Sequence, residues 1–182
     1  MITLDDLRAI CPRTKASRLE PFVEPLNAAM DEYEISANVE REAHFIAQAA
    51  HESMGFNAMN EFASGQAYDE GRLAERLGNT PDDDDDGVRY KGRGIFQLTG
   101  TKNYRDAGTE IFGDPDWLLY HPDKAAEPEN ACRIAGWYWK RNGLNELADR
   151  GDARAITKRI NGWLNGYQDR LSYLEIAQRR LA

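Results

Sequence analysis

The chain has 182 residues, which is the size of one ordinary domain. Hydrophobic residues make up 41% of it and charged residues 30%, a composition that excludes both an intrinsically disordered chain and a membrane-embedded one. Its net charge of -8 at pH 7 argues against a protein that binds nucleic acid by neutralising phosphates. We therefore expect a single soluble domain that spans residues 1–182 and has no nucleic-acid partner.

Apolar residues recur at every third or fourth position through most of the chain, which predicts an all-α fold. Typical helix lengths suggest roughly seven to ten helices, which we expect to form two lobes around a groove. Between Tyr90 and Leu98 we expect at most a short hairpin, because no long run alternates apolar with polar residues. The expected helices lie near 19–33, 38–54, 68–77, 101–112, 128–142, 152–160 and 167–181.

The helix expected at 38–54 has clear end signals. Asn38 is a potential N-cap, and Glu40 and Glu42 lie in the positive first turn. Gly55 is a typical stop signal at the other end.

A run of five aspartates from Asp82 to Asp86 interrupts the helical pattern. Adjacent carboxylates repel each other, so this segment is expected to be a solvated loop. Its spacing also fits the first positions of a calcium loop, but Arg93 stands at the twelfth position, where such a loop needs a bidentate glutamate. The residues therefore predict no bound metal and no cofactor.

The two cysteines, Cys11 and Cys132, are too few for a disulfide framework or a zinc cage. We expect both to be free thiols.

Four polar residues lie in one sector of the expected helix at 38–54: His44, Gln48, His51 and Glu52. Beside an apolar stripe, such a cluster suggests the wall of a cleft. The alternative is an ordinary solvated face with a hydrogen-bonded histidine. Zinc binding is excluded, because His44 and His51 lie roughly 10 Å apart along the helix axis.

Glu52 and Glu61 are the candidate pair for acid–base chemistry. Apolar neighbours and the negative end of the helix dipole should both disfavour the ionised form of Glu52. Glu61 follows in a polar segment outside the helix, where a carboxylate can stay ionised. Two carboxyls in unlike environments are what glycosidic bond cleavage requires.

The segment from Tyr90 to Gly100 contains several glycines, which would let the backbone approach a ligand closely. It lacks the Gly-Lys-Ser/Thr ending of a phosphate-binding loop, so nucleotide binding is not expected.

Several short motifs together resemble glycoside hydrolase family 19, which contains chitinases and many phage endolysins. The similarity runs from Leu4 nearly to the end of the chain and is closest to the compact endolysin branch. One departure is Trp163-Leu164-Asn165-Gly166, which replaces the Gly-Leu-Glu type of sequence in chitinases. In chain order the motifs are His51-Glu52-Ser53, Glu61, Gly92-Arg93-Gly94, Gln97-Leu98-Thr99 and Ile160-Asn161-Gly162.

The resemblance implies a lysozyme- or chitinase-like helical fold and three catalytic residues. Glu52 would be the general acid, Glu61 the general base, and Thr99 the hydroxyl that helps to hold the attacking water. The positions that match the sugar-binding cleft of the family are Gln97, Asn103, Asn161 and Arg170.

Each cleft residue also has a purely structural interpretation. Gln97 and Asn161 could form hydrogen bonds to backbone groups, and Arg170 could form a structural ion pair with a carboxylate and have no other role. Trp137 and Trp139 are expected in the core rather than on a sugar platform.

The resemblance implies an inverting endolysin that hydrolyses the β-1,4 bonds of bacterial peptidoglycan and lyses the host cell. Chitinase activity is the first alternative, lytic transglycosylase activity the second, and a sugar-binding domain without activity the third. We expect a monomer, with no separate cell-wall-binding domain. It would accumulate in the host bacterial cytoplasm until a holin-type membrane partner releases it to the cell wall, because its sequence holds neither an export signal nor an apolar segment long enough to cross a bilayer.

Overall fold

The computed structural model describes residues 1–80 and 85–182, and over these ranges it is helical and has no β-strand. The predicted all-α fold is confirmed. The eight helices of seven or more residues are α1 (Leu4–Ile10), α2 (Ala16–Glu32), α3 (Val39–Glu52), α4 (Gly71–Leu77), α6 (Thr101–Phe112), α8 (Pro128–Arg141), α10 (Ala153–Asn161) and α11 (Tyr167–Leu181).

Short helices fill several of the connections. Three α-helices have only four or five residues, namely α5 (Asp86–Arg89), α7 (Trp117–Tyr120) and α9 (Leu144–Ala148). Three segments are 3₁₀-helices, η1 (Ile35–Ala37), η2 (Gln66–Tyr68) and η3 (Pro122–Ala126).

The predicted number and bounds of the helices need two corrections. The described residues hold eleven α-helices, more than the seven to ten expected, because a helix of one turn leaves no periodic pattern in a sequence. The helix expected from residue 68 begins only at Gly71, since Tyr68 belongs to η2. The solvated loop expected from Asp82 to Asp86 lies outside the described residues over 82–84, and Asp86 begins α5.

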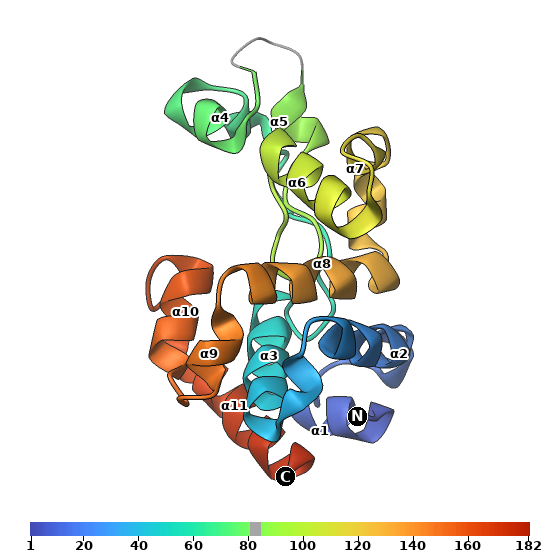
Figure 1. Cartoon of the computed structure of the whole chain (residues 1–182), viewed down its shortest axis with the longest axis vertical. Helices are drawn as coiled ribbons and strands as arrows, with labels where there is room; N and C mark the ends of the chain where they lie inside the picture. The colour runs from blue at the N-terminus through green and yellow to red at the C-terminus, as the bar shows by residue number, and fades with distance from the viewer. Residues whose placement is uncertain (81–84) are drawn as a thin grey trace.

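The helices form two lobes (Figure 1). The lower lobe contains α1 to α3 and α9 to α11, the upper lobe contains α4 to α7, and α8 runs along the boundary between them. Each lobe has its own cluster of buried apolar side chains.

Helix α8 contributes to both clusters through different faces. Cys132, Ala135 and Trp139 lie in the core of the lower lobe, whereas Ile134 and Trp137 belong to the upper one. Residues three or four apart share a helix face, so this spacing makes α8 apolar on two sides. The helix therefore joins the lobes by packing against both.

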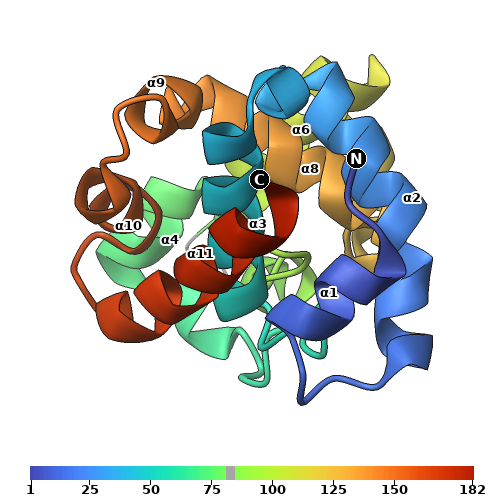
Figure 2. The same cartoon turned by 90° about the horizontal axis from the view of Figure 1, so that it is seen from below.

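Helix α3 is the central helix of the lower lobe, and Figure 2 shows it surrounded by neighbouring helices. The Asn38 side chain accepts a hydrogen bond from the Arg41 backbone N–H at 2.9 Å, so the predicted N-cap is confirmed. The helix ends at Glu52, two residues earlier than expected. Its most extensive partner is α11, which runs antiparallel to it: Arg170 contacts Glu52 at one end, and Gln178 Nε2 donates to Glu40 at 2.9 Å at the other.

Two extended segments, 53–65 and 90–100, run between the lobes (Figure 1). One isolated antiparallel bridge, between Asn60 and Arg93, joins the two segments, and a second, between Arg93 and Leu98, lies within 90–100. The short hairpin expected near Tyr90 to Leu98 is thus reduced to single bridges.

Both cysteines are buried and free, as the sequence suggested. Burial raises the pKa of the Cys11 thiol to about 12 and also raises that of Cys132. Within 1–80 and 85–182, no helix is both long enough and apolar enough to cross a membrane.

An ion pair links the start of α3 to the end of α9. Arg41 Nη2 donates to Asp149 Oδ2 at 2.6 Å, and Asn38 Nδ2 donates to Oδ1 at 2.9 Å. These hydrogen bonds, chiefly the one from Arg41, lower the pKa of Asp149 from 3.8 to about 2.

We expect Asp149→Asn to destabilise the protein near neutral pH, because the ionised carboxylate stabilises the fold only above its unfolded pKa. The stability difference from the wild type should shrink as pH falls from about 4 towards 2, where the carboxylate takes up a proton. Urea unfolding at several pH values measures this difference. Asp5→Asn, which removes an exposed carboxylate, is the control. A difference independent of pH would contradict the assignment.

Candidate active site

The C-terminal end of α3 turns sharply just after Glu52. Ser53 Oγ donates to the Ala49 carbonyl at 2.6 Å and accepts from the Phe56 N–H at 2.9 Å. Met54, Gly55 and Phe56 all have positive φ, which is unusual for the two residues that carry a Cβ. Such backbone strain persists only where the surrounding structure enforces it. The turn holds Glu52 at the end of the helix and leads the chain towards Glu61.

Glu52 is paired with Arg170 of α11. Arg170 Nη2 donates to Glu52 Oε1 at 2.6 Å, and the arginine side chain is only 2% exposed, whereas that of Glu52 is 19% exposed. The sequence predicted apolar neighbours that would disfavour the ionised form of Glu52. That prediction is corrected, because the structure places a buried cation against the carboxyl. The pair brings together the predicted acid and one of the predicted cleft residues.

The remaining donors of Arg170 are also bound. Its Nη1 donates to Gln48 Oε1, and its Nε donates to the Asn165 carbonyl at 3.3 Å. Gln48 Nε2 in turn donates to Thr157 Oγ1 of α10 at 3.3 Å. Three helices thus meet in one buried polar network, and a buried charge is tolerated when it is bound in this way.

This network corrects the interpretation of α3 as a cleft wall along its length. Of the four polar residues, Gln48 and His44 are buried, and only His51 and Glu52 at the end of the helix are partly exposed. The alternative of a hydrogen-bonded histidine on a solvated face is wrong for His44, because the side chain is buried. Its Nδ1 has no hydrogen-bond partner among the described residues, and burial lowers its pKa.

A second pair lies next to the first. His51 Nδ1 and Asp169 Oδ2 are 2.6 Å apart, so two successive residues of α3 contact two successive residues of α11. Gly166, just before α11, packs against the His51 ring so closely that an added Cβ would lie 2.3 Å from Cε1. The first turn of α11 is therefore fixed against the end of α3.

Glu61 is held by different groups. Its Oε1 accepts from the Tyr68 hydroxyl at 2.7 Å, and its Oε2 accepts from the Gly92 N–H at 3.1 Å. The negative carboxylate makes loss of the phenol proton costly, which raises the pKa of Tyr68 to about 12. Both oxygens of the Glu61 side chain therefore accept a hydrogen bond from a fixed donor.

Gly92 lies between Glu61 and Gln97. A Cβ at this position would lie 2.5 Å from Gln97 Oε1 and 3.1 Å from Glu61 Oε2. Gln97 has a positive φ, and its side-chain amide donates to the Gly94 carbonyl at 2.9 Å. Only a glycine leaves room for both polar groups at this point.

Three predicted residues, Gln97, Thr99 and Asn103, line one cavity of about 230 Å³. Thr99 Oγ1 donates to the Gln97 carbonyl at 3.0 Å, and Asn103 Nδ2 donates to the Thr99 carbonyl at 2.7 Å. Tyr138 of α8 lines the same cavity. The cavity therefore lies between α6 of the upper lobe and α8.

Tyr138 lines this cavity and also interacts electrostatically with Glu52. Burial raises the pKa of Tyr138, and the nearby charge of Glu52 raises it further. Asn161 lies apart from the other predicted residues: it is the last residue of α10, and its side chain is exposed.

Sequence reasoning missed Tyr68, Tyr138 and the amide of Gly92 as parts of the site. The sequence predicted Tyr68 only as the first residue of a helix and Tyr138 only as a residue within the helix at 128–142. Trp137 and Trp139 are buried, as predicted, although one edge of Trp137 reaches the cavity.

The chain is similar in sequence to proteins of known families, although no family model matches it. It is 37% identical to a glycosyl hydrolase family 19 domain-containing protein of Haemophilus influenzae over 97 residues, which are 53% of this chain and 45% of that protein. It is also 37% identical to an endochitinase of Arabidopsis thaliana over 121 residues, which are 66% of this chain and 38% of that protein. The chain thus spans less than half the length of either relative.

Solved structures share the fold. A bacterial family 19 chitinase has a TM-score of 0.77 at 22% identity, covering 100% of this chain and 95% of its own. Chitinase C of Streptomyces griseus has a TM-score of 0.76 at 21% identity, covering 99% and 76%. A class IV chitinase of Zea mays has a TM-score of 0.61 at 21% identity, covering 100% and 82%.

The fold is the two-lobed helical fold of family 19 chitinases, as the resemblance implied. In sequence and in fold, the chain is therefore similar to proteins of glycoside hydrolase family 19.

We expect Gly92→Ala to fold normally but to lose about tenfold or more in glycan hydrolysis, because small misplacements of reacting groups are costly. The added methyl group would displace the Gln97 amide and crowd the Glu61 carboxylate. Glu24→Ala is the control, since it changes an exposed side chain of α2 that does not line the cavity. Equal activity of Gly92→Ala and the wild type, at equal melting temperature, would contradict this arrangement.

We expect Arg170→Ala to lower the free energy of unfolding by about 3 kcal/mol, because it leaves Glu52 and Gln48 without their buried cation. Urea unfolding measures the loss. Arg179→Ala, on the same helix, removes only an exposed pair with Glu175 and should cost less than about 0.5 kcal/mol. Similar losses in the two variants would show that the buried network adds little.

Proposed function

We propose that this protein hydrolyses β-1,4 glycosidic bonds with inversion at the anomeric carbon, with Glu52 as acid and Glu61 as base. The observation that carries the proposal is that both glutamates are held in defined positions by polar partners. Glu52 accepts from Arg170 in the lower lobe, and Glu61 accepts from the Gly92 N–H and the Tyr68 hydroxyl. A pair of held carboxyls is what glycosidic bond cleavage requires.

In the proposed reaction Glu52 carries a proton when the glycan binds and gives it to the departing glycosidic oxygen. Glu61 takes a proton from a water molecule as that water attacks the opposite face of the sugar. In inverting enzymes a separation of roughly 6.5–9.5 Å between the two carboxyls leaves room for this water.

We propose that Thr99 orients the water. Its hydroxyl proton is already donated to the Gln97 carbonyl, so its oxygen is free to accept a hydrogen bond. A water that donates one proton to Thr99 and the other to Glu61 directs a lone pair at the anomeric carbon. Gln97 and Asn103, which line the same cavity, would contact the sugar.

As substrate we propose the glycan strands of bacterial peptidoglycan, cleaved in the manner of an endolysin. The resemblance to the compact endolysin branch supports this choice. Chitin is the second candidate, because one relative and three structural neighbours are named chitinases. Both polymers present β-1,4-linked N-acetylated sugars to the cleft.

Two further functions differ from hydrolysis by their products. A lytic transglycosylase would need only Glu52 and would release anhydro sugars. A sugar-binding domain would release no reducing ends.

The cellular setting is proposed on the endolysin assignment alone. The protein would act as a monomer, remain in the host bacterial cytoplasm, and reach the wall when a holin-type partner opens the membrane.

We expect Glu52→Gln and Glu61→Gln each to lose at least about a hundredfold in turnover without unfolding, since each removes one proton-transfer group. NMR of the earliest products should show inverted anomers. Retained anomers would exclude the single displacement, and full activity of Glu61→Gln together with anhydro products would favour the transglycosylase.

The substrate is tested by measuring reducing ends released from purified peptidoglycan and from chitin, with Glu52→Gln as the blank. We expect release from peptidoglycan. Rapid cleavage of chitin with intact peptidoglycan would assign the protein as a chitinase.

A further inference from the structure

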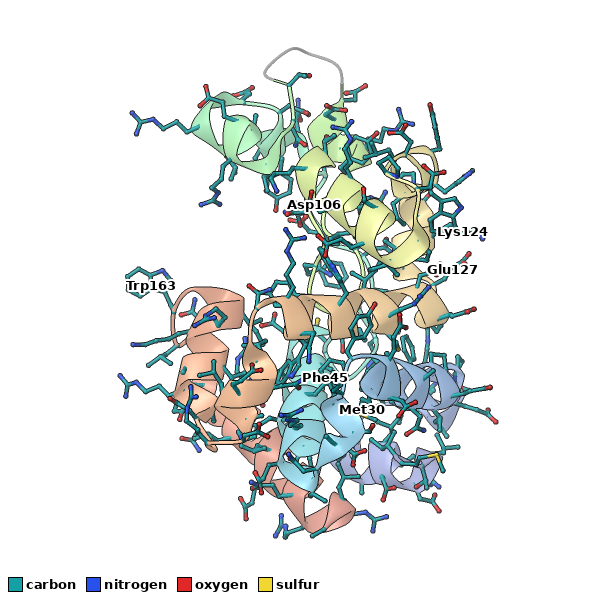
Figure 3. The ribbon with its side chains drawn as sticks, in the orientation of Figure 1. Met30, Phe45, Asp106, Lys124, Glu127 and Trp163 are labelled. Atoms are coloured by element: carbon teal, nitrogen blue, oxygen red, sulfur yellow. The ribbon has the colours of Figure 1, made fainter. Side chains whose placement is uncertain are left out.

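Trp163 differs from the other tryptophans of the chain. It is 76% exposed, whereas Trp137 and Trp139 are buried and Trp117 is half-buried against the Phe112 ring at 4.4 Å. Figure 3 shows Trp163 projecting from the end of α10 at the edge of the lower lobe, away from the helices of that lobe. A large apolar surface is thus left in water, where it contributes nothing to folding.

The loop that carries Trp163 is not a free surface loop. It begins at Gly162, which ends α10 with a positive φ, and it finishes at Gly166, which is packed against His51. The Asn165 carbonyl accepts from Nε of Arg170, the arginine that pairs with Glu52. Trp163 therefore lies two residues before Asn165, whose carbonyl is bound by the arginine that pairs with Glu52.

A fixed, exposed indole suits a ligand with an apolar face. The C–H faces of a pyranose ring pack against aromatic rings, and the indole loses little conformational entropy on binding because its backbone is already held. The position follows directly after Gly162 and the exposed Asn161, so one short segment offers both a polar and an aromatic contact. At this point the chain departs from the Gly-Leu-Glu type of sequence of the chitinases.

We propose that Trp163 is a sugar-binding platform that extends the glycan site beyond the cavity at Gln97, Thr99 and Asn103. The inference rests on the proposed glycan hydrolysis and adds a residue that selects for long strands. A long glycan would contact both the cavity and the indole, whereas a short one would occupy the cavity alone. Trp163 would therefore strengthen binding of long strands and leave the chemical step unchanged.

The kinetic test compares long and short soluble glycan strands from peptidoglycan, and chitin oligomers of two lengths. For Trp163→Ala we expect KM for the long glycan to rise about fivefold to tenfold, with kcat and the KM for the short glycan nearly unchanged. Trp163→Phe keeps an aromatic ring and should recover most of the loss. Tyr120→Ala removes another exposed aromatic, on α7, and should leave both substrates unaffected.

A binding test separates this inference from the proposed reaction. Glu52→Gln is titrated with the same glycans while indole fluorescence is followed. The extra change given by long glycans should disappear in the Glu52→Gln, Trp163→Phe double variant, and any change that comes from Trp137 at the cavity should remain. If the wild type cleaves glycan and Trp163→Ala has unchanged KM for long strands, the platform is excluded and the hydrolase stands. If nothing is cleaved but the Trp163 signal responds to glycan, the hydrolase fails and the platform stands. If neither occurs, both are wrong.

Discussion

The buried guanidinium of Arg170 is the interaction on which the site depends most. A charge that is 2% exposed must be matched by partners, and Arg170 finds them in Glu52, Gln48 and the Asn165 carbonyl. These partners come from α3 and from the loop before α11. One side chain thus fixes the angle between the two helices, the direction of the acid and the course of the loop that carries Trp163. The neighbouring pair of His51 and Asp169 reinforces the same contact.

The cavity at Gln97 and Thr99 follows from a separate constraint, the two apolar faces of α8. Trp139 packs edge-on against Phe45 in the lower core at 5.3 Å, while Trp137 faces the upper core and donates from Nε1 to Glu110 at 2.7 Å. Because α8 serves two cores at once, neither lobe covers it completely. The surface that remains, at Tyr138, borders the cavity at Gln97 and Thr99.

The sequence was sufficient for features that depend on neighbours along the chain. The Asn38 cap, the end of α3 near Glu52 and the free cysteines all follow from local rules. The burial of Gln48 did not, because its partners Thr157 and Arg170 lie 109 and 122 residues away. Tyr68 was missed for a similar reason: its role depends on how the 3₁₀ turn folds back on Glu61, and no periodic pattern records such a contact. The roles of Glu61, Asn161 and Thr99 came from the family resemblance and remain predictions.

The two glutamates are oriented by different lobes. The distance between them is therefore hard to derive from sequence. Glu52 takes its position from α3 and α11, both in the lower lobe. Glu61 takes its position from Gly92 and from Tyr68 of η2, which belong to the extended segment and to the upper lobe. The distance between acid and base is therefore set by the packing of one lobe against the other. Since α8 holds the lobes together, the proposed chemistry depends on a helix that contributes neither carboxyl.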